Sequence, residues 1–275
     1  MAGFDQGPLV EFARHFELVP DPPVPERFWS DWGPVFYRGR TNRSARVLCI
    51  ASDPGPTERI AGRTLVGDAG QRVQGFLSKL GLTRSYLCLN AFAYALIPSE
   101  ANHADEMLEI PEQATWRNRL YDIARTDGLQ AVVAFGQVAR SATELWDGKD
   151  GVTVRCIPHP SSHDEDELLS GWRDGIEHLR TVVTPDDDGD TTLPNYGDAF
   201  QESDYAPIPR QDLPFGAPSF LGDDRWRREG GGRSSVSRRR RTIAIRSSGS
   251  RRPSRPSESR DKRLRGYVLG WRPPG

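Results

Sequence analysis

Two short segments of this sequence place an acid and a histidine at the ends of apolar runs. Asp53 follows the run 47–51 in Ser-Asp-Pro-Gly, and His159 follows the run 152–157 in His-Pro-Ser. Both runs have the length and composition of buried strands. In an open α/β sheet, a ligand crevice forms where the carboxyl ends of the strands meet. A carboxylate and an imidazole at such an edge could carry out general acid–base hydrolysis.

The elements that would position these residues alternate along the chain. Strand patterns cover 46–51, 86–93, 129–135 and 152–157, and helix patterns cover 9–16, 71–80, 112–125, 137–146 and 167–182. Loops are expected at 54–70, which is rich in glycine, and at 97–111, which is polar. Strands that alternate with helices predict a three-layer α/β/α sandwich around a mostly parallel, four-stranded central sheet.

Composition divides the chain into three parts. Residues 1–45 are a lead-in with a Pro-rich stretch that we expect to pack on the core, and residues 46–184 form the α/β domain. Beyond it the periodicity is lost, and residues 229–260 are mostly Gly, Ser, Arg and Pro. Such a composition buries too little apolar surface to offset chain entropy. We therefore predict that residues 185–275 are a disordered linker and tail.

The net charge of −1 conceals a strong asymmetry. Residues 225–275 hold 17 Lys and Arg against 3 Asp and Glu, which leaves a net charge of −15 on the rest of the chain. A basic tail on an acidic body is typical of a chain that binds nucleic acid. A solvated extension without function, or the product of an abnormal reading frame, would have the same composition.

Bulk features exclude several protein classes. No run reaches the ~18 apolar residues that span a membrane, and the N-terminus lacks the pattern of a signal peptide. The three cysteines, Cys49, Cys88 and Cys156, all lie in apolar runs. We expect reduced, buried thiols in a cytoplasmic protein without a membrane partner. Their odd number argues against a disulfide framework.

Three other chemistries fit the residues poorly. The loop 55–64 has six residues between its glycines and then Arg-Thr, whereas a phosphate loop has four and then Lys. Cys156, His159 and His163 have a spacing that could bind zinc, but a fourth ligand is not evident. Ser161 lacks the Gly-x-Ser-x-Gly elbow of a nucleophilic serine. We therefore predict no metal site and no cofactor.

Five segments, taken in order, resemble the motifs of the uracil-DNA glycosylase superfamily. They are Ser-Asp-Pro-Gly around Asp53, Gly-Arg-Thr-Leu-Val-Gly-Asp-Ala-Gly at 62–70, Asn90 at the end of an apolar strand, Ala-Phe-Gly at 134–136, and His-Pro-Ser from His159. The resemblance covers about residues 45–182. It implies a base-excision repair enzyme that flips uracil or another deaminated base out of DNA and hydrolyses its N-glycosidic bond.

The resemblance implies a role for each matching residue. Asp53 would direct the attacking water and stabilise the cationic sugar. Asn90 would read the uracil edge, because an amide donates and accepts hydrogen bonds at once. His159 would donate a hydrogen bond to the base oxygen, which gains charge as the bond breaks. The further candidates are Leu65, Ser52 and Gly55 for the base, and Ser161, Leu168, Leu169, Arg63 and Gly67 for DNA.

Each of the three central residues also has a plainer interpretation. Asp53 could form an Asx turn before Pro54, and Asn90 could satisfy local backbone at a strand end. His159 could be a solvent-facing loop residue. His103 lies where one branch of the family has a histidine that captures the sugar, but the basic residues around that histidine are absent.

Four features depart from the family pattern. Asp53 stands one place later than the Glu of the branch whose first motif reads Gly-Glu-x-Pro-Gly. Leu65 replaces an aromatic residue that stacks on the base, so Phe92 or Phe135 could stack instead. The iron–sulfur cysteines are absent, which predicts no cluster. Four acids follow Ser162, where the family inserts a wedge into DNA. The next two leucines could be that wedge, but the acids would repel phosphates.

Three functions therefore stay open. The first is a monomeric DNA glycosylase that binds uracil-containing or otherwise damaged DNA, and that is nucleoid-associated if the basic tail binds DNA. The second is a non-catalytic member of the fold that binds damaged DNA, which Leu65 and the four acids favour. The third is a hydrolase of free nucleosides or nucleotides, which the acidic body favours.

Overall fold

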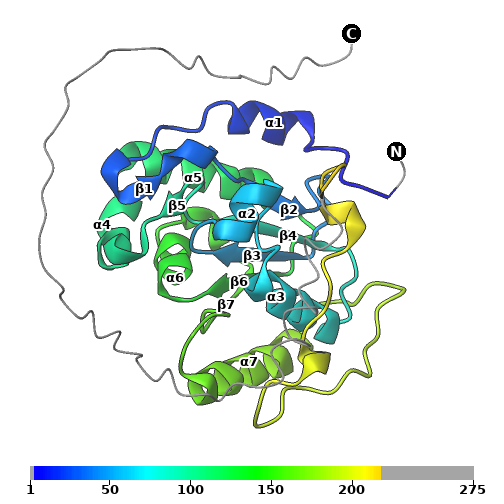
Figure 1. Cartoon of the computed structure of the whole chain (residues 1–275). Helices are drawn as coiled ribbons and strands as arrows, with labels where there is room; N and C mark the ends of the chain where they lie inside the picture. The colour runs from blue at the N-terminus through cyan, green and yellow to red at the C-terminus, as the bar shows by residue number, and fades with distance from the viewer. Residues whose placement is uncertain (1–2, 218–275) are drawn as a thin grey trace, which may run out of the picture. The chain divides into compact units, whose positions relative to one another are not determined.

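A computed structural model describes residues 3–217 of the chain, so the predicted basic tail at 225–275 lies outside the described residues. A central sheet lies between layers of helices (Figure 1). The strands are β1 (Phe28–Trp29), β2 (Tyr37–Gly39), β3 (Val47–Ala51), β4 (Tyr86–Asn90), β5 (Ala95–Leu96), β6 (Ala131–Phe135) and β7 (Thr153–Ile157). The α-helices are α1 (Val10–Phe16), α2 (Pro56–Ala61), α3 (Asp68–Lys79), α4 (Ala104–Leu108), α5 (Pro111–Ala124), α6 (Gln137–Glu144) and α7 (Glu165–Leu179).

Five strands form the central sheet in the order β2-β4-β3-β6-β7. The last four are parallel, and β2 pairs antiparallel with β4 at one edge. The predicted α/β/α fold with a mostly parallel sheet is confirmed, but the predicted number of four strands is wrong. β2 has only three residues, too few for a period of two to be recognised within the Pro-rich lead-in.

The register of the parallel strands aligns their carboxyl ends. Ala51 of β3 pairs with Asn90 of β4, and Phe135 of β6 pairs with Ile157 of β7. From β3 the chain first adds β4 on one side and then β6 on the other. Strand order therefore reverses at β3, and open α/β sheets bind ligands beside such a reversal.

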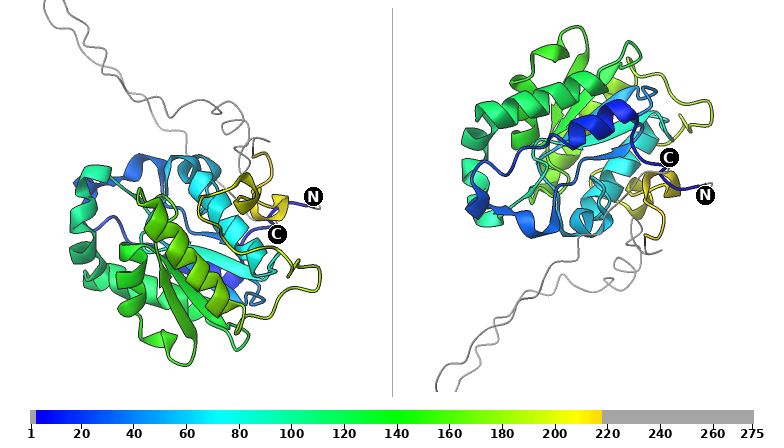
Figure 2. Two further views of the ribbon diagram at one scale, coloured as in Figure 1. Left: turned by 90° about the horizontal axis from the view of Figure 1, so that it is seen from below. Right: turned by 90° about the horizontal axis from the view of Figure 1, so that it is seen from above.

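Two apolar layers cover the faces of the sheet. Val47 and Cys49 of β3 pack toward α3 and α7, whereas Leu48 and Ile50 pack toward α1 and α5. Figure 2 shows α7 on the near side in the view from below, and α1 and α5 on the near side in the view from above. Every residue of β3, β4 and β6 is buried, as expected for strands covered on both faces.

Short helices lie where loops were predicted. α2 lies within the glycine-rich segment 54–70, and α4 follows a 3-10 helix, Pro98–His103, within the segment 97–111. Both α2 and α4 have fewer than two turns, which is too short for a helical period to be recognised in the sequence. None of the described helices is long and apolar enough to cross a membrane.

The predicted disorder of residues 185–217 is wrong. This segment, called the strap below, contains two 3-10 helices, Glu202–Asp204 and Arg210–Asp212, and packs on the α/β body. Its Ile208 and Leu213 join a small apolar cluster with Ala61 and Val66. The strap has no apolar period, and this is why its composition indicated a disordered linker.

Three buried aspartates anchor the strap to the body. Asp204 forms an ion pair of 2.8 Å with Lys79, and Asp212 forms one of 3.2 Å with Arg38. Asp186 accepts hydrogen bonds from the backbone N–H groups of residues 83, 84 and 85. Because these are contacts at single positions, they leave no periodic signal in the sequence.

Candidate active site

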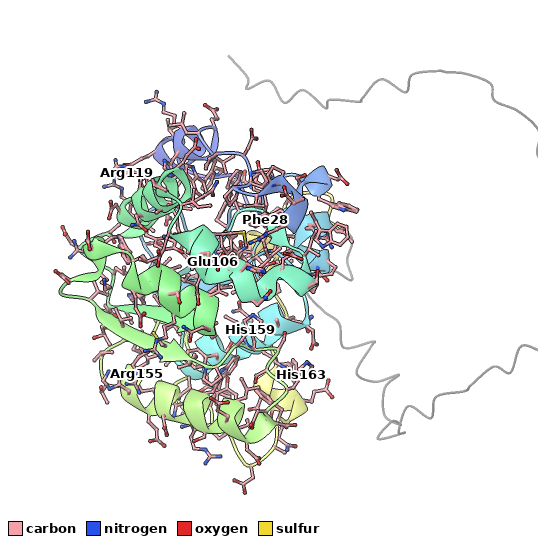
Figure 3. All side chains as sticks on the ribbon, turned by 90° about the vertical axis from the view of Figure 1, so that its left-hand side faces the viewer. Phe28, Glu106, Arg119, Arg155, His159 and His163 are labelled. Atoms are coloured by element: carbon pink, nitrogen blue, oxygen red, sulfur yellow. The ribbon has the colours of Figure 1, made fainter. Side chains whose placement is uncertain are left out.

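The loops that follow the parallel strands bring the predicted acid, amide and imidazole to one edge of the sheet. Asp53 lies two residues beyond β3, Asn90 is the last residue of β4, and His159 lies two residues beyond β7. Figure 3 shows the side of the molecule on which His159 and Phe28 lie. The carboxyl ends of the strands therefore form the candidate site, and the segments that hold each side chain determine its chemistry.

Two neutral donors hold the Asp53 carboxylate. Oδ1 accepts a hydrogen bond of 2.8 Å from the Ser52 hydroxyl, and Oδ2 accepts one of 2.9 Å from the backbone N–H of Leu96. Neither donor is the backbone N–H two residues later that an Asx turn would use. Burial raises the pKa of Asp53 above its ordinary value of 3.8, although the two hydrogen bonds and Arg59 oppose this shift. The carboxylate is therefore more basic than usual.

A two-stranded ribbon positions the donor from Leu96. β5 pairs antiparallel with β1, and the register matches Leu96 with Phe28 and Ala95 with Trp29. The ring of Phe28 also packs edge-on against Phe92, with the ring centroids 5.5 Å apart. No motif in the sequence pointed to Leu96, because it contributes only a backbone group.

Asn90 presents a buried amide with an unused donor. The residue is 4% exposed, and its Nδ2 has no hydrogen-bond partner within the protein. Leaving a buried donor unpaired costs about 1–3 kcal/mol. Tyr86 and Cys88, which alternate with Asn90 along β4, face the α3 and α7 layer, so Asn90 shares that face. The unused donor is what a site that recognises a carbonyl oxygen requires.

His159 is held as a neutral ring. Burial lowers the pKa of His159 below its ordinary value of 6.5. Its Nδ1 accepts a hydrogen bond of 3.1 Å from the backbone N–H of Ser161, which assigns the ring proton to Nε2. Gly136 after β6 makes room for the imidazole. Its φ is +87°, and a Cβ there would lie 2.8 Å from the Cβ of His159. The ring can therefore act as a neutral hydrogen-bond donor.

A pocket of about 510 Å³ lies beside His159, on the β7 side of the site. Its lining includes Gly136, Arg140, Cys156, Ser162 and Glu167, but neither Asp53 nor Asn90. The structure thus brings the acid and the amide to the same edge as His159 without placing them in this pocket.

The glycine loop between α2 and α3 is held by an acid that the sequence analysis missed. The buried Glu58 accepts hydrogen bonds of 2.8 Å from the backbone N–H groups of Val66 and Gly67. Gly70 lies against the same loop, since a Cβ there would be 1.8 Å from the carbonyl oxygen of Leu65. Among the sequence signals, the position of Glu58 one turn after Gly55 could have indicated this role.

Leu65 is mostly covered. It is 6% exposed and belongs to the apolar layer of α3 and α7. Its φ of +53° lies in the left-handed region, which costs a branched side chain about 1–2 kcal/mol. Backbone strain of this kind gathers at functional sites. The aromatic alternatives are part of the core, because Phe92 and Phe135 are both buried.

The predicted DNA wedge is wrong. Leu168 and Leu169 belong to α7, which begins at Glu165 rather than at 167, and their side chains are buried in the core. The carboxylate of Asp164 caps this helix by accepting a hydrogen bond of 2.9 Å from the N–H of Glu167. The four acids therefore form the cap and first turn of a helix, where negative charge stabilises the helix dipole.

The other three predicted DNA-contact residues, Arg63, Gly67 and Ser161, have different environments in the structure. Arg63 is committed to Asp5 in an ion pair of 2.7 Å, so it is not a free phosphate ligand. Gly67 caps α3 and donates its N–H to Glu58. Ser161 is exposed beside His159.

The cysteines and the remaining histidines supply no metal site. Cys49 and Cys88 are buried as predicted, but Cys156 is exposed, because β7 is an edge strand. Within residues 3–217, no group of three or more His, Cys, Asp or Glu side chains could hold a metal ion. His103 lies 3.6 Å from Glu106 on a partly exposed helix end.

Comparison with known proteins does not assign the chain to a family. No protein-family model matches the sequence, and no curated protein shows a significant match to it. Its function is therefore inferred from the geometry and chemistry of the site.

Proposed function

We propose that this protein hydrolyses the N-glycosidic bond of uracil or another deaminated base in DNA. The observation that carries the proposal is the unpaired, buried Nδ2 of Asn90, at the same sheet edge as a basic carboxylate and a neutral imidazole. The Asn90 amide would donate to the O4 of uracil and accept from its N3–H. Cytosine has an amino group in place of O4, so two donors would face each other and cytosine would be rejected.

His159 would stabilise the departing base. Its Nε2–H would donate to the O2 of uracil, which gains negative charge as the glycosidic bond breaks. The lowered pKa keeps the ring neutral near pH 7, so no buried cation has to be maintained between reaction cycles.

Asp53 would act on water and on the sugar. The base leaves with the bonding electron pair, and the oxygen of water bonds to C1′ of the sugar. The negative carboxylate stabilises the positive charge on the sugar and accepts a hydrogen bond from the attacking water. Its raised pKa supports this role, because a stronger base binds the water proton better.

Uracil release from a single-stranded and a double-stranded oligonucleotide tests the proposal. We expect release by the wild-type protein, and we expect its loss in His159→Ala and Asn90→Ala. His103→Ala is the matched control for His159, because His103 is partly exposed and outside the site. If the His159 and Asn90 variants release uracil as fast as wild type, the proposed chemistry is wrong. Hypoxanthine and xanthine substrates in the same assay identify the base.

A second candidate function is binding of damaged DNA without turnover. The buried position of Leu65 favours it, since no aromatic side chain of the glycine loop stacks on a base. Tight binding to abasic DNA together with no release of any base would select this function. Release from free nucleosides alone would instead select a nucleoside hydrolase.

A further inference from the structure

Two exposed tryptophans and an arginine form a cluster beside the candidate site. Trp29 is 44% exposed and Trp32 is 59% exposed, although large aromatic side chains are usually well buried. The guanidinium carbon of Arg59 lies 5.8 Å from the Trp29 ring centroid and 5.7 Å from that of Trp32. These three residues are called the Trp–Arg platform below.

The platform is connected to the Asp53 carboxylate by two routes. Trp29 belongs to β1, which pairs with β5, and β5 supplies the Leu96 N–H that binds Asp53. Arg59 belongs to α2, which begins three residues after Asp53, and its charge acts on the pKa of Asp53. The Trp–Arg platform therefore adjoins the segments that hold Asp53.

The chemistry of the platform fits nucleobases. Bases of unpaired nucleic acid stack on aromatic rings and on arginine planes, and each stacked base contributes about 1–3 kcal/mol to binding. Arg59 also supplies a positive charge for the backbone, whereas Asp31, between the two indoles in the sequence, would repel it. The rings would therefore contact base faces, and the phosphates would pass on the Arg59 side.

We propose that the Trp–Arg platform binds unpaired DNA bases next to the site by stacking them on Trp29 and Trp32. The position of these bases relative to a flipped nucleotide rests on the proposed function. Binding of undamaged single-stranded DNA does not rest on it, because a thymine strand offers nothing to excise.

Fluorescence anisotropy of a short labelled oligothymidylate tests this proposal with the full chain. The basic residues at 225–275 would also hold the strand, so titrations are run at about 0.3 M salt, where phosphate contacts weaken and stacking persists. We expect Trp32→Ala to weaken binding about tenfold or more. Trp32→Phe should retain most of the affinity. Phe215→Ala is the matched control, because Phe215 is 65% exposed on the strap, and it should bind as wild type does.

A strand of the same length without bases separates stacking from charge. The loss in Trp32→Ala should be confined to the strand that carries bases. Equal affinity of Trp32→Ala and Phe215→Ala for oligothymidylate would overturn the proposal, as would an equal loss on the base-free strand. Loss of self-association in Trp32→Ala with unchanged DNA affinity would instead assign the platform to contact with a second copy.

The platform and the catalytic proposal fail in different experiments. His159→Ala should lose uracil release and keep its affinity for oligothymidylate. Failure of the catalytic proposal would leave the affinity difference between Trp32→Ala and wild type intact. Circular dichroism of each variant confirms that the fold is unchanged.

Discussion

Asp53 at the candidate site is partly buried and Asp186 in the strap is buried, yet their pKa values move in opposite directions. Burial raises the pKa of Asp53, and only two neutral donors bind its oxygens. Burial also acts on Asp186, but the Ser85 hydroxyl and three backbone N–H groups outweigh it and lower its pKa to about 2. The larger number of donors on Asp186 therefore accounts for the opposite pKa shifts of the two carboxylates.

The candidate site combines three local costs to stability, whereas two anchors of the strap have their charges paired. The site has the underbonded Asp53 carboxylate, the unpaired Nδ2 of Asn90 and the left-handed backbone of Leu65. Each costs stability, and a protein retains such costs where a function requires them. In the strap, by contrast, Asp186 and Asp204 have their charges matched by basic partners.

The largest expected effect comes from removing the charge at the site. We expect Asp53→Asn to lower the single-turnover rate of uracil release by about 10²–10⁴-fold. The free energy of unfolding should stay the same or rise, because the poorly solvated charge is removed. Rate and thermal denaturation are measured on the same preparation. A variant that is inactive because it is unfolded would contradict the contrast with the strap.

Displacing the imidazole should have the next largest effect. Gly136→Ala places a Cβ against His159, and we expect uracil release to fall on the order of 100-fold. Gly151→Ala is the matched control, since Gly151 has a similar φ of +79° but no atom near a Cβ. Alanine at either position has to adopt a positive φ. Equal rates in the two variants would show that the contact with His159 does not matter.

Removing the anchor charge should affect stability alone. We expect Asp186→Asn to lose about 2 kcal/mol of unfolding free energy near pH 7, from a pKa that falls from 3.8 to about 2. The folded-state pKa is lowered, so the stabilisation is present above pH 3.8 and disappears as the pH falls toward 2. Denaturant titrations of wild type and variant at several pH values measure this difference.

The exposed Asp188 provides the control for Asp186. Asp188→Asn should leave the unfolding free energy almost unchanged, since surface ion pairs contribute little. Uracil release should continue in Asp186→Asn at temperatures where the variant is folded. A loss of activity without a loss of stability would remove the distinction between anchor and site.

The last prediction concerns the pH dependence of uracil release by the wild-type protein. The proposed mechanism requires an ionised Asp53, whose pKa is raised above 3.8. It also requires a neutral His159, whose pKa is lowered below 6.5. Both requirements fail on acidification, so the rate should rise between these two pH values by about tenfold per pH unit and then level off. An acid limb centred above pH 6.5 would contradict the neutral imidazole.

The sequence predicted the sheet edge better than it predicted the strap or the wedge. Runs such as 47–51 and 131–135 are continuously apolar, so the ends of buried strands, and with them Asp53 and Asn90, could be located. Leu168 and Leu169 were assigned to the surface because the capping role of Asp164 was not recognised. The helix that Asp164 caps begins at Glu165, and both leucine side chains face the core.

The contacts that fix the strap have no local signature. Ser85 and Asp186 are 101 residues apart, and Lys79 pairs with Asp204 from a different part of the chain. Glu58 likewise accepts hydrogen bonds from backbone N–H groups of the glycine loop eight and nine residues later. The sequence does not show that these N–H groups lack any other acceptor. Such contacts depend on where segments meet in space, which no periodicity of one segment reveals.

The pairing of Arg38 with Asp212 also has a consequence for the order of folding. Arg38 in β2 is fully buried, yet its carboxylate partner is synthesised 174 residues later. Before Asp212 is made, Arg38 has only neutral partners such as Thr64 and Gln74. A buried guanidinium without a carboxylate is unfavourable, so β2 gains its full stability only when the strap is in place. Asp5 also depends on the strap, since its backbone N–H donates a hydrogen bond to the carbonyl oxygen of Leu213. β2 is therefore made before the strap but is locked into the fold only after it.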